Sequence, residues 1–262
     1  MTMNHEYQKI PLQRLLNVQS TIESECIVQE SIITLHSIGK SGEFEPHISL
    51  LGTPSRIKEL HIGHLVCEGL TIEFPLLNEF ENHIEDGHVN SFYNSIISTT
   101  PEPRLITTSC GSCNHPDLSV VQLHGRPMSQ VQQLTHDQLN QALDRMRGEM
   151  KLFEATGGCH GAALLDSTGN VQFVSEDIGR HNAVDKTIGL AILSGLKTFN
   201  DFTLLLSGRC GWDIVAKATR IGIANIASVG AFSSAALDLA RANGITLYGF
   251  VRDSGAWKAG LN

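Results

Sequence analysis

The stretch that decides the fold is residues 202–251, FTLLLSGRCGWDIVAKATRIGIANIASVGAFSSAALDLARANGITLYGFV. Apolar runs at 202–206, 226–229 and 246–251 alternate with segments of helical pattern at 212–221 and 233–242. Strands that alternate with helices of this length form parallel β-α-β crossovers. We therefore predict an α/β fold for this part of the chain, with any ligand in the crevice at the carboxyl ends of the strands.

The same unit extends upstream to residue 135. Thr135-x-x-Gln138 has the pattern of a capping box, and apolar residues follow at helical spacing until Gly157-Gly158. These apolar residues, which we expect to be buried, are Leu139, Leu143, Met146, Met150 and Phe153. A hairpin over 162–175 and a helix from about Asn182 complete the unit.

Upstream of residue 135 the pattern favours strands, with one helix. Residues 21–35 indicate one long strand or a bent pair, and 71–77 and 88–98 indicate weaker strands joined by a solvated acidic segment, 79–86. Thr53-Pro54 has the pattern of an N-cap with proline at the first helical position, which predicts a helix that ends at Gly69. We expect His61 and His64 to lie on its surface or half-buried.

These patterns divide the chain into three parts. Residues 1–20 are expected to be a poorly specified N-terminal extension, and residues 21–134 a β-rich half. Residues 135–262 are expected to be an α/β half that binds the ligand.

The composition limits the class of protein. At 262 residues the chain is long enough to bury a core without disulfides. Its formal charge of −8 argues against non-specific binding to nucleic acid or to an anionic membrane, because both need a basic surface. The start of the chain does not have the apolar stretch of a signal peptide, and no apolar run is long enough to span a bilayer. With six scattered cysteines, we expect a cytoplasmic protein with reduced thiols.

Cys110-Gly-Ser-Cys113 lies in a polar stretch, 107–116, so both thiols are expected on a loop, where reactive groups are displayed. A Cys-x-x-Cys spacing can ligate a metal, form a redox disulfide or hold a thiolate of lowered pKa. Zinc would need two more ligands, and only Cys159, His160 and His181 are candidates, because the chain has no second Cys-x-x-Cys. We expect no tightly bound zinc.

The α/β half carries motifs that suit an anion. The turn Ser207-Gly208-Arg209 and the turn at 230–234 each follow a strand and enter a helix, which exposes free backbone N–H groups. The motif at 176–186 crowds both charge signs between a strand and a helix, and 249–255 closes the last strand. We predict that Arg180, Arg209 and Arg252 converge on phosphates.

The order and combination of these motifs resemble the FdhD family, the sulfur carriers or sulfurtransferases required for formate dehydrogenase activity. The resemblance covers nearly the whole chain. It depends on Cys110-x-x-Cys113, Thr156-Gly-Gly-x-His160, Glu176-Asp-x-Gly-Arg180-His181-Asn-x-x-Asp-Lys186, Ser207-Gly-Arg209 and Gly249-Phe-x-Arg252. It implies a cytidine-deaminase-like, three-layer α/β/α fold without deaminase zinc chemistry, in a chain that usually forms a homodimer.

The resemblance also implies a reaction. Cys110, assisted by Cys113, would accept sulfur from a cysteine desulfurase as a persulfide. The chain would then sulfurate the molybdenum bis(guanine dinucleotide) cofactor before this cofactor enters the formate dehydrogenase apoenzyme. The resemblance places the guanine-dinucleotide contact at Phe250, Val251, Arg252, Asp253, Ser254 and Gly255. We expect the remaining contacts from His160, Arg180, His181, Ser207, Gly208 and Arg209, and GDP as a surrogate ligand.

Two other functions fit parts of the sequence. A chaperone could hold the cofactor by its phosphates and pass it on without thiol chemistry. A zinc hydrolase of deaminase type is disfavoured, because the chain lacks a His-x-Glu followed by Pro-Cys-x-x-Cys.

Overall fold

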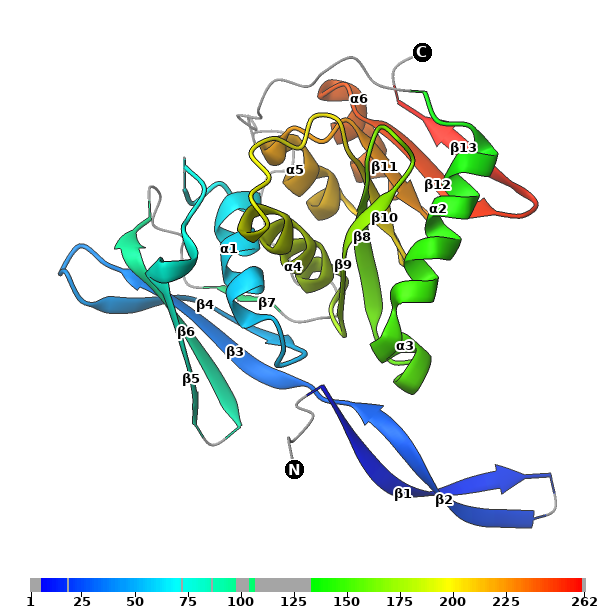
Figure 1. Cartoon of the computed structure of the whole chain (residues 1–262), viewed down its shortest axis with the longest axis horizontal. Coiled ribbons are helices and arrows are strands. Elements are labelled where there is room, and N and C mark those ends of the chain that lie inside the picture. The colour runs from blue at the N-terminus through cyan, green and yellow to red at the C-terminus, as the bar shows by residue number, and fades with distance from the viewer. Residues whose placement is uncertain are drawn as a thin grey trace.

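The computed structural model describes residues 6–17, 19–71, 73–85, 87–97, 104–106 and 133–260, with 104–106 as backbone only. Figure 1 shows an α/β body, a second sheet that joins it through helix α1, and a separate two-stranded ribbon. The first half holds β1 (Tyr7–Leu16), β2 (Gln19–Val28), β3 (Ser31–Ile38), β4 (Phe44–Gly52), α1 (Ile57–Cys67), the short 3₁₀ helix η1 (Leu77–Glu79), β5 (Phe80–Glu85), β6 (His88–Ile96) and β7 (Arg104–Ile106). The second half holds α2 (His136–Glu149), α3 (Lys151–Thr156), β8 (His160–Leu165), β9 (Val171–Asp177), α4 (Arg180–Leu193), β10 (Thr203–Leu206), α5 (Trp212–Ile221), β11 (Asn225–Ser228), α6 (Ser234–Ala242), β12 (Thr246–Arg252) and β13 (Gly255–Ala259).

The body is built on a six-stranded sheet in the order β13-β12-β11-β10-β8-β9. Strands β10, β11 and β12 are parallel, and the helices α5 and α6 connect them. Strand β8 runs antiparallel to β10 and forms a hairpin with β9, while β13 runs antiparallel to β12. The predicted crossovers and hairpin are confirmed.

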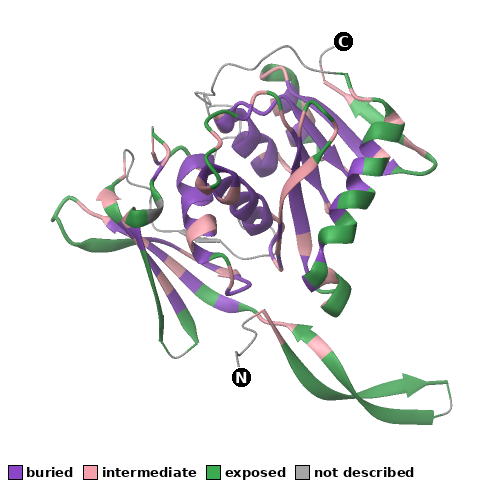
Figure 2. Ribbon diagram, in the orientation of Figure 1, coloured by how far each residue is buried: buried purple, intermediate pink, exposed green. Residues whose placement is uncertain are grey.

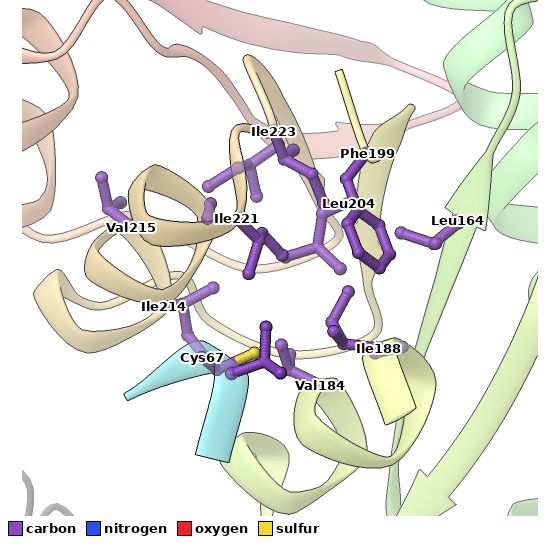
Figure 3. Packing of buried hydrophobic residues seen from close by; sticks show 14 of the residues in the cluster. Cys67, Leu164, Val184, Ile188, Phe199, Leu204, Ile214, Val215, Ile221 and Ile223 are labelled. Carbon is purple, nitrogen blue, oxygen red and sulfur yellow. The ribbon is translucent and has the colours of Figure 1, made fainter. Parts of the chain in front are cut away.

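Alternate residues of the central strands face two helical layers, because side chains along a strand point to opposite faces. Leu164 and Leu204 pack in a cluster with residues of α1, α4, α5 and α6. Their neighbours Leu165 and Leu205 pack instead with Leu143 and the other apolar residues of α2. Figure 2 shows the buried strands between these layers, and Figure 3 shows the first cluster. The α/β class and its three-layer arrangement are confirmed.

Helix α1 joins the second sheet, in the order β5-β6-β3-β4-β7, to the body. One side of α1 packs on the apolar face of β3, β4 and β6. On its other side α1 meets α4 at backbone distance: a Cβ at Gly63 would lie 1.8 Å from the Asp185 carbonyl oxygen, and one at Gly189 would lie 1.9 Å from that of Glu59. Only glycine at these two positions lets the helices approach this closely.

Three histidines are buried beside α1. The ring centroid of His47 (β4) lies 5.3 Å from that of His61 and 5.9 Å from that of His64. His61 shares a 2.8 Å hydrogen bond with Ser91, and Nδ1 of His64 lies 3.4 Å from Oδ2 of Asp185. The expectation of surface or half-buried histidines is therefore wrong, because α1 is covered by the second sheet on one side and by α4 on the other.

The N-terminal ribbon differs from the expected poorly specified extension. Strands β1 and β2 pair in antiparallel register from Tyr7↔Val28 to Leu16↔Gln19. Cross-strand polar pairs support the register, including a 3.1 Å ion pair between Arg14 and Glu23. The chain breaks between β2 and β3, so of the two alternatives predicted for residues 21–35, the bent pair of strands is correct and the single long strand is not.

Helix α1 begins later than Thr53-Pro54 predicts. The backbone N–H of Thr53 donates to Oδ2 of Asp177, and its Oγ1 accepts from the N–H of Ile178. Because these contacts occupy both groups, Thr53 ties the chain to β9 and does not cap a helix. The N-cap is Arg56, in the left-handed region with φ 50°.

The segment between α1 and β6 also differs from the prediction. The described part of 71–77 is not a strand, and the N–H of Leu76 donates to the Glu79 carboxylate at 2.6 Å, which stabilises a turn. The acidic residues that follow lie in β5, paired with β6 from Phe80↔Tyr93 to Glu85↔His88. Charged side chains suit this position because β5 is an edge strand.

The predicted capping box at Thr135 and Gln138 is confirmed, and so is the burial of Leu139, Leu143, Met146 and Met150. The helix, however, breaks at Met150 into α2 and α3. The carboxylate of Glu176 accepts the N–H groups of Leu152 and Phe153 at 2.9 and 2.7 Å, so α3 begins on a side chain from β9.

Replacing Gly63 by alanine is expected to lower the free energy of unfolding by about 1–3 kcal/mol, because the added methyl group collides with backbone of α4. The matched control is Gly148→Ala in α2, where a Cβ would meet nothing within 4 Å. That change should stabilise the protein by about 0.5–1 kcal/mol through helix propensity. Urea denaturation of both variants measures the difference, and equal stabilities would contradict the close crossing of α1 and α4.

Candidate functional site

The turns that follow the three parallel strands lie side by side at one edge of the sheet. The N–H of Gly230, after β11, donates to the carbonyl of Gly208, after β10, at 3.2 Å. The N–H of Phe250, in β12, donates to the carbonyl of Gly230 at 2.9 Å. The predicted gathering of the three turns at the carboxyl edge is confirmed.

His160 joins this edge from β8. Because β8 is antiparallel to β10, its first residue lies where β10 ends. The N–H of Gly161 donates to Oγ of Ser207 at 2.8 Å, and the N–H of Ser207 donates back to the carbonyl of Gly161 at 3.0 Å. A Cβ at Gly208 would lie 2.9 Å from Nδ1 of His160, so this glycine makes room for the imidazole.

A cavity of about 540 Å³ opens between these strand ends and α2. Its volume lies within the range of ligand-binding pockets, about 300–1,000 Å³. Of the predicted site residues, it is lined by His160, Ser207, Val251, Arg252 and Asp253.

Helix α2 supplies a wall that the sequence analysis did not assign to the site. Asn140, Asp144 and Arg147 line the cavity at helical spacing, over an apolar floor that includes Met146 and Met150. The amide of Asn140 donates to Oδ1 of Asp253 at 2.9 Å, so α2 also holds the loop after β12. The sequence does contain a signal for this wall, because these polar residues recur at i, i+4 and i+7 and so share one face of the predicted helix.

A second hollow of about 410 Å³ lies on the other side of Arg252. Phe250, Ser254 and Gly255 line it, together with Trp257, whose side chain is 71% exposed. Phe250 has a φ of 51°, a strained conformation for a residue with a side chain. Two exposed aromatic rings beside a guanidinium suit a planar ligand that carries negative charge.

Positive charge gathers around His160. Burial lowers the pKa of His160 below its usual value, and the charges of Arg180 and Arg209 lower it further. In the described part of the chain, Nε of Arg180 is buried and has no hydrogen-bond partner. The charges of Arg180 and Arg209 therefore act on His160, although neither residue lines the cavity, and Arg252 lines the cavity with His160. This arrangement offers an anion one neutral imidazole and several cationic donors.

His181 is placed differently from the other predicted residues. It is buried at the start of α4, and its Nε2 contacts Oδ2 of Asp213 in α5. Burial lowers the pKa of His181 to about 4, although Asp213 opposes this shift. His181 does not line either hollow, so its role in ligand binding stays a prediction.

Most charged side chains of the 176–186 motif make contacts inside the protein and do not face a ligand site. Glu176 caps α3, and Asp177 lies 2.6 Å from the Nζ of Lys186, with neither side chain exposed. Glu176 therefore serves α3, Asp177 binds both Lys186 and the N–H of Gly179 at the start of α4, and Lys186 faces an internal carboxylate. Within this motif Arg180 alone directs positive charge toward His160.

Two cysteines in the described part of the chain, Cys159 and Cys210, lie near the site, and their burial makes them poor nucleophiles. Burial raises the pKa of both Cys159 and Cys210 far above the ordinary value, so both stay protonated. Cys110 and Cys113 lie outside the described residues. Among the residues that are described, no three His, Cys, Asp or Glu side chains are placed to hold a metal ion, and no helix is long and apolar enough to cross a membrane.

Comparison with known proteins identifies the family. The model of the FdhD/NarQ family matches residues 28–256, which include the Cys-x-x-Cys segment and every residue that lines the two hollows except Trp257. The chain belongs to the FdhD/NarQ family. The resemblance predicted from the motifs is therefore confirmed.

Several FdhD/NarQ relatives carry the name sulfur carrier protein FdhD. That of Picrophilus torridus is 38% identical over 207 residues, 78% of each chain. That of Streptomyces avermitilis is 40% identical over 248 residues, 87% of this chain and 84% of the relative. The fold is similar to the crystal structure of a putative formate dehydrogenase accessory protein from Desulfotalea psychrophila, with a TM-score of 0.73 at 22% identity, covering 97% of this chain and 96% of that one.

The charge environment of His160 gives a testable expectation. Replacing Arg209 by glutamine removes one of the positive charges that act on the imidazole, so the pKa of His160 should rise. NMR titration of the histidine ring protons measures it. The control, Arg145→Gln, removes a guanidinium that donates to the carbonyl of Gly169 and should leave the titration unchanged. An unchanged pKa in Arg209→Gln would show that Arg209 points away from the site.

Proposed function

We propose that this chain is a sulfur carrier that accepts sulfur from a cysteine desulfurase and delivers it to the molybdenum bis(guanine dinucleotide) cofactor of formate dehydrogenase. The observation that carries the proposal is the family match across residues 28–256, since relatives over most of this length are sulfur carrier proteins. The two hollows at the carboxyl edge support it independently, because their guanidinium and aromatic groups suit a nucleotide.

Sulfur loading proceeds by thiol exchange on Cys110. The Cys110 thiolate attacks the outer sulfur of the desulfurase persulfide, the donor's S–S bond breaks, and the donor cysteine leaves as a thiolate. Cys110 then carries the outer sulfur as a persulfide. The buried, protonated Cys159 and Cys210 are poor candidates for this step, because the thiolate is the nucleophile.

Delivery uses Cys113 as the resolving thiol. Its thiolate attacks the inner sulfur of the Cys110 persulfide, which forms a Cys110–Cys113 disulfide and releases the outer sulfur as sulfide to the metal centre. The two electrons that reduce this sulfur come from the two cysteines. A cellular dithiol reductant then restores both thiols.

The α/β half holds the cofactor by its nucleotide. Arg252 stands between the two hollows and can bind a phosphate with paired donors. Phe250 and Trp257 offer faces on which a guanine base stacks, and the carboxylate of Asp253 offers an acceptor for its N–H donors. A local site of this kind is required, because a chain of formal charge −8 repels a polyphosphate elsewhere.

Sulfur loading is tested by intact-protein mass spectrometry after incubation with a cysteine desulfurase and cysteine. Wild type should gain the mass of one sulfur atom, and Cys110→Ala should not, because the proposal makes the Cys110 thiol the acceptor. Cys159→Ala is the matched control and should load normally. Loading that survives in Cys110→Ala would contradict the assignment, and no loading of wild type would favour a cofactor chaperone without thiol chemistry.

Nucleotide binding is tested by calorimetry with GDP. Arg252→Ala should weaken binding by about 1.5–3 kcal/mol through the loss of a charged hydrogen bond. Trp257→Ala should weaken it by about 1–3 kcal/mol through the loss of stacking. The control is Arg241→Ala, which removes an exposed charge at the end of α6. Unchanged affinity in Arg252→Ala would show that the residue only ends the strand, and both variants should still load sulfur at Cys110.

A further inference from the structure

The tip of the β12–β13 hairpin carries two residues that line the cavity, Arg252 and Asp253, and both are exposed. The register of the two strands shifts between Gly249 and Arg252, where the N–H of Phe250 donates to the carbonyl of Gly230. A shift of this kind interrupts the ladder, and a short two-stranded end is at best marginally stable by itself. Contacts from outside the hairpin therefore decide where Arg252 and Asp253 stand relative to the cavity.

Helix α2 makes two such contacts. Nε2 of His136, in the first turn of α2, donates to the carbonyl oxygen of Arg252 at 2.7 Å. The amide of Asn140 donates to Oδ1 of Asp253 at 2.9 Å. His136 and Asn140 lie at i and i+4, so both side chains leave the same face of the helix. Because the apolar face of α2 packs on the sheet, these two bonds tie the hairpin tip to the core of the α/β half.

The surroundings of His136 favour a protonated ring. Its Nδ1 lies 3.3 Å from Oδ1 of Asp137, and its Nε2 faces the carbonyl oxygen of Arg252. Both oxygens only accept, and an imidazolium has two N–H donors where a neutral imidazole has one. The hydrogen bond to Arg252 raises the pKa of His136 above its usual value, and the charges of Asp137 and Asp253 raise it further. Partial burial opposes this shift without reversing it, and the positive end of α2 also acts against the charge.

We propose that His136 is a positioning residue that, with Asn140, clamps the hairpin tip against the cavity, and that the clamp is complete only when the His136 ring carries a proton. His136 lines neither hollow, so it acts through Arg252 and does not touch the ligand. A deprotonated ring loses one of its two donors, which leaves either the Arg252 carbonyl or the Asp137 carboxylate facing a lone pair. The effect of the clamp on binding rests on the nucleotide site proposed above, but the clamp itself needs no ligand.

Hydrogen exchange without ligand tests the clamp. At about pH 5.5, the amides of residues 252–257 should exchange about 3- to 10-fold faster in His136→Ala than in wild type, the range expected for the loss of one hydrogen bond. His136→Gln should exchange as wild type does, because its amide still donates to the Arg252 carbonyl. As the pH is raised to about 8.5, wild type should lose protection relative to His136→Gln, because the imidazole titrates and the amide does not.

The matched control is His83→Ala, which removes an exposed histidine whose Nε2 lies 3.8 Å from the Glu81 carboxylate in β5 of the second sheet. This variant should leave the exchange of the hairpin tip unchanged at every pH. Equal exchange of the tip in wild type and in His136→Ala would overturn the proposal, whether or not a nucleotide binds.

Calorimetry with GDP across the same pH range measures the consequence for binding. The terminal phosphate of GDP itself titrates near about pH 6, so the useful quantity is the ratio of the wild-type affinity to that of His136→Gln, in which this contribution cancels. That ratio should fall about 3- to 10-fold from about pH 5.5 to about pH 8.5. A merely structural role would change the affinity equally at every pH, so a constant ratio would overturn the role of the proton.

Asn140→Ala should weaken GDP binding about 3- to 10-fold without changing its pH dependence, because the amide does not titrate. Its control is Gln141→Ala, which removes an exposed amide at the next position of α2 and should bind GDP as wild type does. No binding of GDP to wild type would refute the nucleotide site of the proposed function, and hydrogen exchange would still decide the clamp. Equal binding of GDP by wild type, His136→Ala and Asn140→Ala would leave the nucleotide site intact and overturn the clamp.

Discussion

A carboxylate and an ammonium with no exposure to solvent lie where the two halves of the chain meet. Asp177, at the end of β9, lies 2.6 Å from Nζ of Lys186 in α4, and the same ammonium donates to the carbonyl of Thr53 at 2.9 Å. Asp177 also accepts the N–H groups of Thr53 and Gly179. Removing one partner of such a pair leaves a buried charge that costs about 3–5 kcal/mol. The position of the second sheet and the start of α4 both depend on this contact.

The end of β9, which carries Asp177, also positions parts of the candidate site. Glu176 precedes Asp177 and faces the other layer, where it fixes the start of α3 and so the turn that carries Gly157 and Gly158 into the cavity. Arg180 follows three residues after Asp177 and directs its charge at His160. One strand end thus positions a wall of the cavity, a cation beside it and the junction with the N-terminal half.

The sequence was sufficient to predict the features that are determined by residues close together in the chain. The parallel crossovers, the capping box at Thr135 and the gathering of the turns at Gly208, Gly230 and Phe250 follow from short patterns and a general rule of α/β sheets. The family could also be predicted, because the order of several motifs is more specific than any one of them.

Features that depend on distant partners were not predictable in the same way. Thr53 has the pattern of a helix cap, but Asp177, far along the chain, takes its N–H. The 176–186 motif suggested an anion site, although most of its charges satisfy one another inside the protein. The wall that α2 adds to the cavity required knowledge of which face of the helix meets the sheet.

The buried histidines beside α1 make the stability of this region depend on pH. Burial lowers the pKa of His47 to about 3 and lowers that of His61 well below its usual value, with each neighbouring imidazole opposing a further positive charge. In the unfolded chain both would titrate near the ordinary value, about 6.5. Their folded pKa values lie below the unfolded ones, so the unfolded state takes up protons first. Stability from this region is therefore complete above about pH 6.5 and is lost as the medium is acidified toward pH 3. Acidification therefore weakens the packing of α1 against the second sheet, where His47 and His61 are buried.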